Sequence, residues 1–384
     1  SGITDTLLQA ATAAAAGDTD YTSKLKIAED RHIEAVKLLL PVAGQSALLS
    51  LVKKSCNEIE DICNGIFLLR ELTARSKDRI ASYGEWLSSR IIHAHLEASG
   101  VQAAWKDARE LIVTNSNFTN AEVDFAETNL RISGYVQSEP AALVVVPGFI
   151  AADKAGITTT LGRGGSDYTA AVFAAALDAE ALEIWTDVSG MMTADPRLTA
   201  NARIIPAISY GEAMELSHFG AKVIYPPTIQ PVMNKSIPVW IKNTFRPADK
   251  GTLIEAGSAA AGDIVRGISS MDQVALLSLE GSGMVGIPGF SKRLFEALSN
   301  EKINVILITQ SSSEHSICVA IGAAFAERAE QAVNAAFANE IALQKVEPLK
   351  VEKELSIVAL VGESMKSHTG VSGRMFSAMG RNGV

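Results

Sequence analysis

The chain has 384 residues and a formal net charge of −9 at pH 7, with 34 Lys and Arg residues against 43 Asp and Glu residues. This length suits two or three domains, and an acidic chain of this kind argues against a nucleic-acid partner. No apolar run approaches the length of a membrane-spanning helix, so we expect no membrane partner either.

The cysteines and histidines indicate neither disulfides nor a metal site. Cys56 and Cys63 fall two turns apart on an expected helix, roughly 10 Å along its axis, which is too far for a disulfide. Free thiols and the absence of a signal-like segment favour a reducing, cytoplasmic setting. The six histidines are scattered, so no histidine metal site is expected.

The first quarter of the chain is expected to be helical. Residues 1–5 suggest a turn that follows a strand, and an alanine-rich helix is expected from Thr6 to Ala16. From Lys24 to about Leu96, apolar residues recur at three- and four-residue spacing. This pattern indicates amphipathic helices packed on one another.

A glycine-rich turn at residues 158–167 lies between an apolar run, Ala142 to Phe149, and an alanine-rich stretch, Tyr168 to Leu177. These flanks predict a buried strand and a helix. The turn's glycines can adopt backbone angles closed to other residues, and Ser166 is a suitable N-cap. Free N–H groups at the start of a helix form an anion site.

Arg163 and Asp167 give this turn its chemical character. The Arg163 guanidinium can hold a carboxylate or phosphate through two parallel hydrogen bonds. Asp167 is also favoured simply by the dipole of a helix's first turn. From spacing alone, helix capping and ligand binding therefore stay equally open.

Four motifs occur in a fixed order along the chain: Leu-Gly-Arg-Gly-Gly-Ser-Asp-Tyr at 161–168, Glu-Ile-Trp-Thr-Asp-Val at 183–188, Ala-Asp-Pro-Arg at 194–197 and Phe-Gly-Ala-Lys-Val at 219–223. Together they resemble the aspartate kinases of the amino-acid kinase family. The resemblance implies an α/β fold with an open, mainly parallel sheet between helices. It also implies transfer of the γ-phosphate of ATP, with Mg²⁺, to the side-chain carboxylate of L-aspartate, the first step towards threonine, lysine and methionine.

The resemblance also implies how the substrate is held. Arg163 would bind the α-carboxylate and Glu85, within a matching segment at residues 80–88, would pair with the ammonium group. Asp167 would orient cations around the phosphates, because the substrate carboxylate is already ionised and needs no base. The remaining substrate-side residues would be Thr4, Phe149, Gly164, Gly165 and Ser166.

The expected nucleotide site follows the next strand, Leu182 to Thr186, whose carboxyl end is where open α/β sheets bind ligands. Met192 stands where the family usually has a tyrosine, and Tyr225 where it has a histidine. Taken singly, each candidate also fits an ordinary turn or surface position. The residues that the resemblance assigns to ATP are Thr186, Asp187, Met192, Arg197, Lys222 and Val223.

The rest of the chain contains a repeat. Residues 251–268 are rich in glycine and alanine and predict a linker, so the kinase domain is expected at 1–250. Residues 281–295 align without gaps on residues 362–376. The expected order of strand, helix, strand, strand, helix, strand resembles ACT domains, which are ferredoxin-like α+β units. The first unit is expected at 269–350, and the start of a second, truncated unit at 351–384.

ACT-like units imply an amino-acid effector and a homo-oligomer formed through these units. Residues 310–314 and 346–351 resemble the bifunctional aspartate kinase/homoserine dehydrogenases. This favours threonine as the effector, with Gln310 and Ser311 as regulatory residues.

Two other functions stay open. The chain could be a catalytically silent fragment for amino-acid sensing or assembly, or a kinase for another acidic amino acid. The phosphate loop Lys-Phe-Gly-Gly-Thr, with which the family begins, does not occur in this sequence. We therefore expect this chain by itself to have impaired activity.

Overall fold

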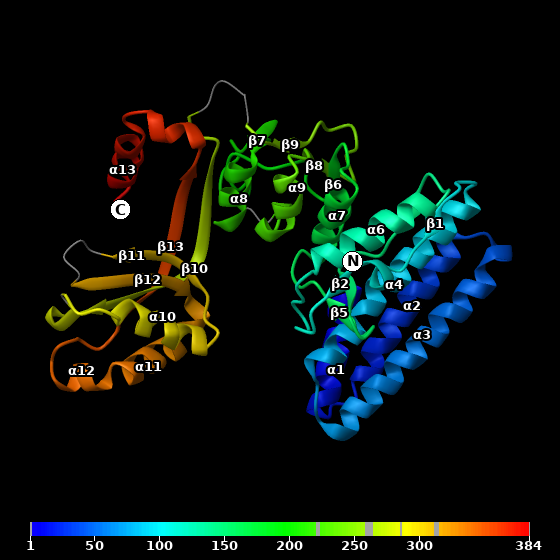
Figure 1. Ribbon diagram of the computed structural model, residues 1–384, viewed down its shortest axis with the longest axis horizontal. Coiled ribbons are helices and arrows are strands. Elements are labelled where there is room, and N and C mark those ends of the chain that lie inside the picture. Colours follow the sequence, from blue (N-terminus) through cyan, green and yellow to red (C-terminus); the bar gives the residue numbers. More distant parts are fainter. Residues whose placement is uncertain (1, 220–222, 258–263, 285, 311–314, 384) are drawn as a thin grey trace. The chain divides into compact units, whose positions relative to one another are not determined.

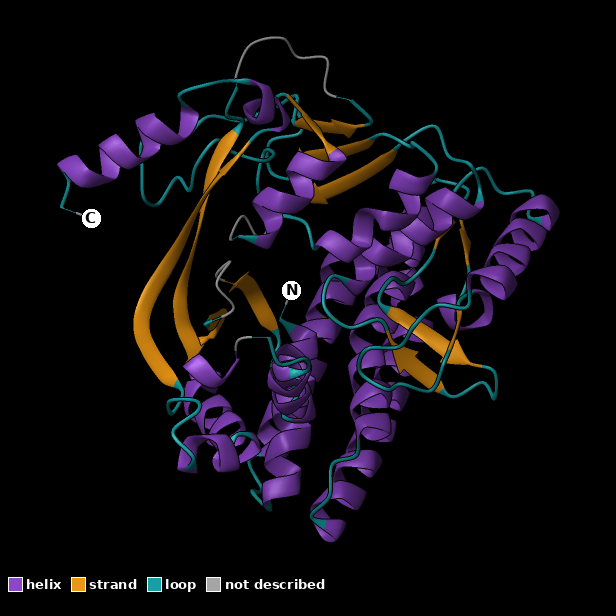
Figure 2. Ribbon diagram, turned by 60° about the vertical axis from the view of Figure 1, so that its left-hand side comes forward, coloured by secondary structure: helices purple, strands orange, loops and turns teal. Residues whose placement is uncertain are grey.

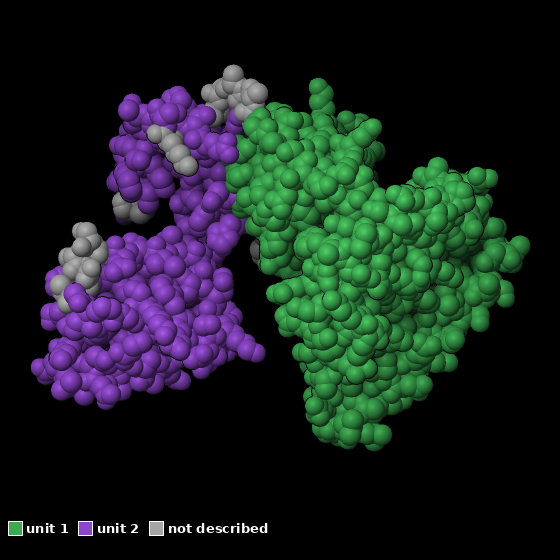
Figure 3. Space-filling view, viewed as in Figure 1, with its two compact units in different colours: residues 1–191, 204–214, 223–260 green, residues 192–203, 215–222, 261–384 purple. Residues whose placement is uncertain are grey.

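A computed structural model of the chain describes residues 2–219, 223–257, 264–284, 286–310 and 315–383 (Figure 1). The chain forms two compact units (Figure 3). The first unit comprises residues 1–191, 204–214 and 223–260, and the second comprises residues 192–203, 215–222 and 261–384. No helix of the described residues is both long and apolar enough to cross a membrane.

Four helices, α1 (Ile3–Ala16), α2 (Tyr21–Leu39), α3 (Val42–Leu69) and α4 (Ala74–Ala98), lie side by side at the start of the first unit (Figure 1). Their apolar stripes meet in two clusters of buried side chains. The helical prediction is confirmed for this region, but α1 begins earlier than expected. Gly2 adopts a left-handed conformation and its carbonyl accepts hydrogen bonds from the backbone and side chain of Thr6. Thr4 therefore lies in the first turn of a helix.

The strands of the first unit form three small sheets. The pairing is parallel for β1–β3, β2–β4, β6–β8 and β7–β9, and antiparallel for β4–β5 and β8–β9. The mainly parallel character that was expected is therefore present, divided among three sheets. The strands are β1 (Ala104–Trp105), β2 (Val113–Thr114), β3 (Val144–Val145), β4 (Ile150–Asp153), β5 (Thr158–Thr160), β6 (Leu182–Thr186), β7 (Ala207–Ser209), β8 (Val239–Asn243) and β9 (Thr252–Glu255).

Shorter helices connect these strands. The helix that follows the glycine-rich turn is α7, and α6 and α9 both pack against it. The helices are α5 (Ala108–Leu111), α6 (Phe125–Ser138), α7 (Gly165–Ala176), α8 (Tyr210–His218), the 3₁₀ helix η1 (Pro226–Ile229) and α9 (Gln230–Asn234).

Two predictions, one of a strand and one of a linker, were wrong in this unit. The apolar run 142–149 contains only the two-residue strand β3, because Phe149 has a φ angle of 70° and turns the chain into β4. The expected linker 251–268 begins with β9, which completes a four-stranded sheet beside β8 and β7. Its last two residues already belong to strand β10 of the second unit.

The second unit contains a four-stranded antiparallel sheet in the order β11–β12–β10–β13. Helices α10 and α11 cover one face of this sheet, with Leu294 and Val333 buried against β10 and β12 (Figure 1). The elements are β10 (Gly267–Glu280), η2 (Ser282–Met284), α10 (Phe290–Asn300), β11 (Val305–Gln310), β12 (Ser316–Gly322), η3 (Ala323–Phe325), α11 (Ala326–Ala336), α12 (Ala338–Ala342), β13 (Lys350–Val361), η4 (Glu363–Ser367) and α13 (Val371–Arg381).

The sequence repeat is also a structural repeat. Helices α10 and α13 both follow a left-handed glycine, Gly289 or Gly370, 81 residues apart (370 − 289). Strands β10 and β13 are long, curved and paired with one another (Figure 2). Each bends near its centre at a residue with positive φ, Gln273 and Glu354, which are again 81 residues apart (354 − 273). The two strands are therefore related by an approximate two-fold axis through these bends.

We expect Phe337→Ala to destabilise the second unit by about 3–5 kcal/mol, because large cavities in a closed core cost this much. Phe337 is fully buried, its ring stacks on Phe290 at 5.6 Å and the Arg293 guanidinium lies 4.4 Å above it. Chemical denaturation followed by circular dichroism measures the loss. The more exposed Phe325 on η3 provides the control, and an equal loss in Phe325→Ala would contradict this assignment of the core.

Candidate active site

The turn between β5 and α7 is built by glycines in conformations that other residues avoid. Gly162 and Gly164 have φ angles of 71° and 69°, and Gly164 is the N-cap of α7. The prediction that Ser166 caps this helix was therefore wrong: α7 starts at Gly165, and Ser166 lies inside its first turn. The first N–H groups of α7 have no partner within the helix, and that of Gly165 donates instead to the carbonyl of Gly162 at 3.1 Å.

Neighbouring segments pack so closely against this turn that a side chain on its glycines would clash with them. A methyl group added to Gly165 would lie 2.8 Å from Cδ2 of Phe149, and one added to Gly148 would lie 2.9 Å from Cα of Ser166. On the other side, a methyl group on Gly164 would lie 2.8 Å from Cβ of Tyr225. The turn is thus held between the Gly148–Phe149 bend and the segment that leads into η1.

Phe149 is held in its unusual conformation by two backbone hydrogen bonds. Its N–H donates to Oγ1 of Thr169 on α7 at 3.0 Å, and its carbonyl accepts from the N–H of Leu161 at 3.0 Å. A left-handed conformation is costly for a bulky residue and persists where the surrounding structure fixes it, often at binding sites. The structure therefore places Phe149 beside the glycine turn, where the sequence predicted a substrate contact.

Arg163 points its charge to the surface of the first unit. The side chain is exposed and its guanidinium lies 5.9 Å from the ring centre of Tyr225. Among the described residues no carboxylate forms an ion pair with it. The guanidinium is therefore available to an external anion.

Two half-buried carboxylates, Glu85 on α4 and Asp167 on α7, likewise have no hydrogen-bond or ion-pair partner in the described part of the chain. Burial raises the pKa of each, since removal from water disfavours the charged form. Thr4 packs on α4 beside Gly84, the residue before Glu85: a Cβ added to Gly84 would lie 2.8 Å from Oγ1 of Thr4. Carboxylates placed in this way favour a cationic ligand group.

The expected nucleotide residues are divided between the two units. Thr186, Asp187 and Val223 belong to the first unit, with Thr186 at the carboxyl end of β6 and its hydroxyl donating to Asp187 at 3.2 Å. Met192 and Arg197 belong to the second unit. Lys222 lies outside the described residues.

Arg197 is engaged by its own loop. Its guanidinium donates three hydrogen bonds of 2.7–3.1 Å to the carboxylate of Asp195, which lowers the pKa of that carboxyl. The side chain of Arg197 is largely exposed. A phosphate would have to compete with Asp195, and exposed pairs of this kind hold their partners weakly.

Sequence reasoning missed three polar groups near these residues. Asn243, at the end of β8, donates to Oγ of Ser189 at 2.9 Å and ties together the loops that follow two parallel strands. Tyr225 was noted only as a departure from the family pattern, although it packs on Gly164. Asp78 on α4 is a buried carboxylate bound by Thr119 and Thr160. The alternation of β8 could have indicated Asn243, whereas Asp78 gives no signal because its partners are distant in sequence.

In the second unit, Gln310 lies at the end of β11 beside a cavity of about 300 Å³ at the start of α10. Ser311 lies outside the described residues. The lining consists of Met284, Gly286, Ile287, Pro288, Gly289, Phe290, Ser291, Gln310 and Ile317.

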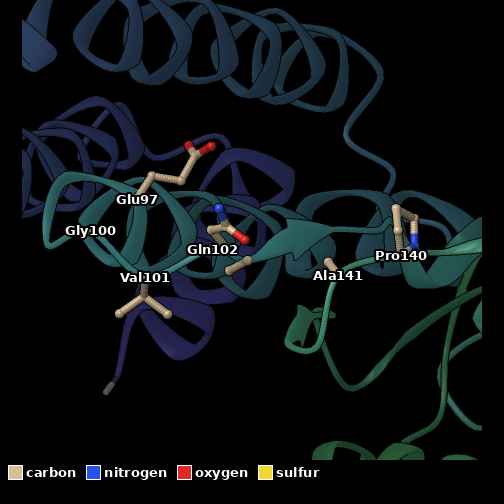
Figure 4. A pocket seen from close by; sticks show the side chains of 7 residues that line it. Glu97, Gly100, Val101, Gln102, Pro140 and Ala141 are labelled. Carbon is tan, nitrogen blue, oxygen red and sulfur yellow. The ribbon is translucent and has the colours of Figure 1, made fainter.

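A separate open pocket of about 550 Å³ lies at the end of α4, where residues 97 and 100–103 meet Pro140 and Ala141 (Figure 4). None of the residues predicted for substrate or nucleotide lines this pocket. The described residues also include no group of three His, Cys, Asp or Glu side chains arranged to hold a metal ion.

The glycine turn that opens α7 therefore carries an arginine without an ion-pair partner in the described part of the chain, and Glu85 on α4 and Asp167 on α7 are carboxylates without one. Residues 2–243 match the model of the amino acid kinase family, and residues 277–337 match that of an ACT domain. The chain belongs to the amino acid kinase family.

Within that family the chain is similar to aspartokinases. It is 40% identical over 308 residues to a bifunctional aspartokinase/homoserine dehydrogenase of Haemophilus influenzae, covering 80% of this chain and 38% of the relative. It is 33% identical to a chloroplastic enzyme of the same name from Zea mays, covering 100% of this chain and 42% of that one. The structure of Escherichia coli aspartokinase III with aspartate and ADP superposes with a TM-score of 0.81 at 30% identity, covering 98% of this chain and 82% of the other.

The chain thus spans about two fifths of the length of these two bifunctional relatives. The kinase fold and the ACT unit expected from the sequence are confirmed by these matches and by the strand order of the second unit.

We expect Asp167→Asn to raise the melting temperature of the unliganded chain at pH 7. Burial raises the folded-state pKa of Asp167 above its unfolded value, so the stability linked to this group is present at low pH and is lost as pH rises through the folded pKa. Asparagine carries no charge, so the variant does not lose stability as pH rises through this pKa. The gain should shrink as pH is lowered from 7 through the folded-state pKa of Asp167, below which the wild-type carboxyl is protonated.

Differential scanning fluorimetry across this pH range measures the effect. Asp61→Asn, at an exposed position on α3, provides the control and should change stability by no more than about 0.5 kcal/mol. A fall in melting temperature at pH 7 in Asp167→Asn would contradict the expectation.

Proposed function

We propose that the chain is an aspartate kinase, which transfers the γ-phosphoryl group of ATP to the side-chain carboxylate of L-aspartate and gives 4-phospho-L-aspartate. The observation that carries the proposal is the unpaired Arg163 on a left-handed glycine turn, packed against Phe149 and followed by the unpaired Asp167. Its relatives are named as aspartokinases, and the superposed Escherichia coli enzyme holds aspartate and ADP.

The charges of the site complement those of aspartate. Arg163 binds the α-carboxylate through two parallel hydrogen bonds, which the planar guanidinium suits. Glu85 pairs with the ammonium group, and Thr4, which packs against the neighbouring Gly84, adds a hydroxyl. Gly164, Gly165 and Ser166 line the same substrate at the start of α7, and Phe149 forms the apolar wall. Gly164 and Ser166 offer their backbone N–H groups, whereas the N–H of Gly165 donates to the carbonyl of Gly162 at 3.1 Å.

Phosphoryl transfer needs positioning and charge stabilisation and little covalent chemistry from the protein. The attacking carboxylate is ionised at neutral pH, so no residue is needed as a general base. Asp167 therefore orients cationic groups around the transferred phosphate. When bound with ATP, Mg²⁺ would neutralise the charge of the phosphates.

Thr186 and Asp187, at the carboxyl end of β6, hold the nucleotide together with Val223. The family resemblance assigns the same role to Met192, Arg197 and Lys222. Arg197 exchanges its bonds to Asp195 for bonds to phosphate. Three free cysteines among the described residues support a reducing compartment such as the cytoplasm.

The cavity beside Gln310 is the effector site. It lies where the N–H groups of α10 begin, after the left-handed Gly289, and such groups favour a carboxylate. Gln310, with Ser311, provides side-chain hydrogen bonds to an amino acid, and threonine is the effector that we favour. The sheet of this unit also supports pairing with a second copy of the chain.

We expect Arg163→Ala to weaken L-aspartate binding by about 2–4 kcal/mol, because a charged ligand group loses its two-point partner. Arg163→Lys should recover only part of this loss, since lysine keeps the charge without the planar fork. Isothermal titration calorimetry in the presence of Mg·ADP measures both affinities.

The matched control is Arg131→Ala on α6, which breaks an exposed pair with Glu127 and should leave aspartate binding unchanged. Titration with L-glutamate and N-acetyl-L-glutamate tests the alternative substrates. Unchanged aspartate affinity in Arg163→Ala would remove the glycine turn from the substrate site.

We expect Gln310→Ala to weaken L-threonine binding about tenfold, the effect of losing one hydrogen bond to a charged or polar ligand group. Thr309→Ala is the matched control, because neighbouring residues of a strand face opposite sides of the sheet. Calorimetry with L-threonine and, separately, L-lysine measures the effect. If neither amino acid binds the wild-type chain, the second unit serves assembly alone.

A further inference from the structure

Asp78, on the inner face of α4, is a carboxylate that the mechanism above does not use. It is 1% exposed, and no cation pairs with it in the described part of the chain. Instead it accepts four hydrogen bonds from neutral donors. These are the N–H of Thr119 to both oxygens at 3.0 and 2.9 Å, the N–H of Thr160 at 3.0 Å and the hydroxyl of Thr160 at 2.7 Å.

Both donor residues adjoin the glycine turn. Thr160 is the last residue of β5 and lies three positions before Arg163. Thr119, with a φ angle of 72°, and Asn120 form the wall on the other side. A methyl group added to Gly162 would lie 2.6 Å from Oδ1 of Asn120 and 3.2 Å from the carbonyl oxygen of Thr119. Asp78 therefore holds both the start of the turn and the loop against which the turn packs.

The same helix carries Glu85. Glu85 follows Asp78 by seven residues, about two turns or roughly 10 Å along α4. A second tie lies next to Glu85, where the indole N–H of Trp86 donates to Asp107 at 3.2 Å. Asp107 in turn binds Arg109, whose guanidinium donates to Oγ1 of Thr158 at 3.4 Å, at the start of β5. Helix α4 is thus bonded to both ends of β5.

We propose that Asp78 is a positioning residue for the substrate: it sets the distance between Glu85 on α4 and Arg163 on the turn, and so matches the site to the separation of an ammonium group and an α-carboxylate. This role rests on the proposed function. A buried carboxylate suits it better than an apolar side chain would, because several directed hydrogen bonds fix the register of two elements whereas apolar contacts allow them to slide.

Three variants test this role: Asp78→Asn, Thr160→Val and Thr160→Ser. Asparagine at position 78 places an NH₂ donor against the N–H groups of Thr119 and Thr160, which need an acceptor. Valine keeps the shape of Thr160 and removes its hydroxyl, and serine keeps the hydroxyl. For each variant, calorimetry gives the dissociation constants of L-aspartate and of Mg·ADP, and thermal unfolding gives the stability.

We expect the dissociation constant of L-aspartate to rise about tenfold in Thr160→Val and further in Asp78→Asn, as for loss of a hydrogen bond to a charged group. That of Mg·ADP should stay within about twofold, and Thr160→Ser should bind aspartate like the wild type. A residue that only stabilised the fold would lower the melting temperature and leave the aspartate affinity of the folded protein unchanged, which would overturn the proposal.

If Asp78→Asn does not fold, the comparison of valine with serine at position 160 decides the question. If the wild-type chain does not bind aspartate, the proposed function itself is refuted. This result differs from unchanged affinity in the variants because it occurs without any substitution.

Discussion

The first unit depends on close approach of backbone segments at the start of α7. Three segments that are far apart in the chain meet there: the Gly148–Phe149 bend, the turn at 162–165 and the segment around Tyr225. A side chain at any of these glycines would push the segments apart. Because nothing larger than hydrogen fits at these positions, the start of α7 and the Arg163 guanidinium lie next to one another, and the substrate binding that we propose depends on this arrangement.

The acidic character of the chain places a second constraint on the site. With a net charge of −9, the overall field repels an anionic nucleotide, so binding must come from a few cations at defined positions. No carboxylate among the described residues pairs with Arg163, whose guanidinium lies over the ring of Tyr225, while Arg197 is bonded to Asp195. In the proposed site the two arginines therefore differ: an anion binds Arg163 directly, whereas at Arg197 it must displace Asp195.

The sequence predicted those parts of the structure that depend on local pattern. Periodicity located the long helices, and Leu182–Thr186 forms the expected strand with the expected limits. The repeat predicted equivalent glycines before α10 and α13. Motif order predicted the candidate site as a set, with Thr4, Glu85 and Phe149 added by resemblance alone. Where the pattern was ambiguous, as in the apolar run 142–149, it could not show that Phe149 would turn the chain.

Contacts between residues far apart in the chain could not be predicted from the sequence. Asp78 binds donors 41 and 82 residues away, and no local pattern distinguishes it from a surface aspartate on a helix. Strand β9 was masked by its glycine- and alanine-rich surroundings, and it forms only because β7 and β8 supply pairing on both sides. In each case the decisive interaction is between residues that become neighbours only after folding.

The ribbon formed by β10 and β13 bears on how the second unit unfolds. The half of β10 before Gln273 pairs with the half of β13 after Glu354, so each repeat obtains an edge strand from the other. No peptide bond can be cut between the repeats without removing a strand from one of them. The repeats should therefore lose their structure in a single cooperative transition, and a protease should find no intermediate in which one repeat survives alone.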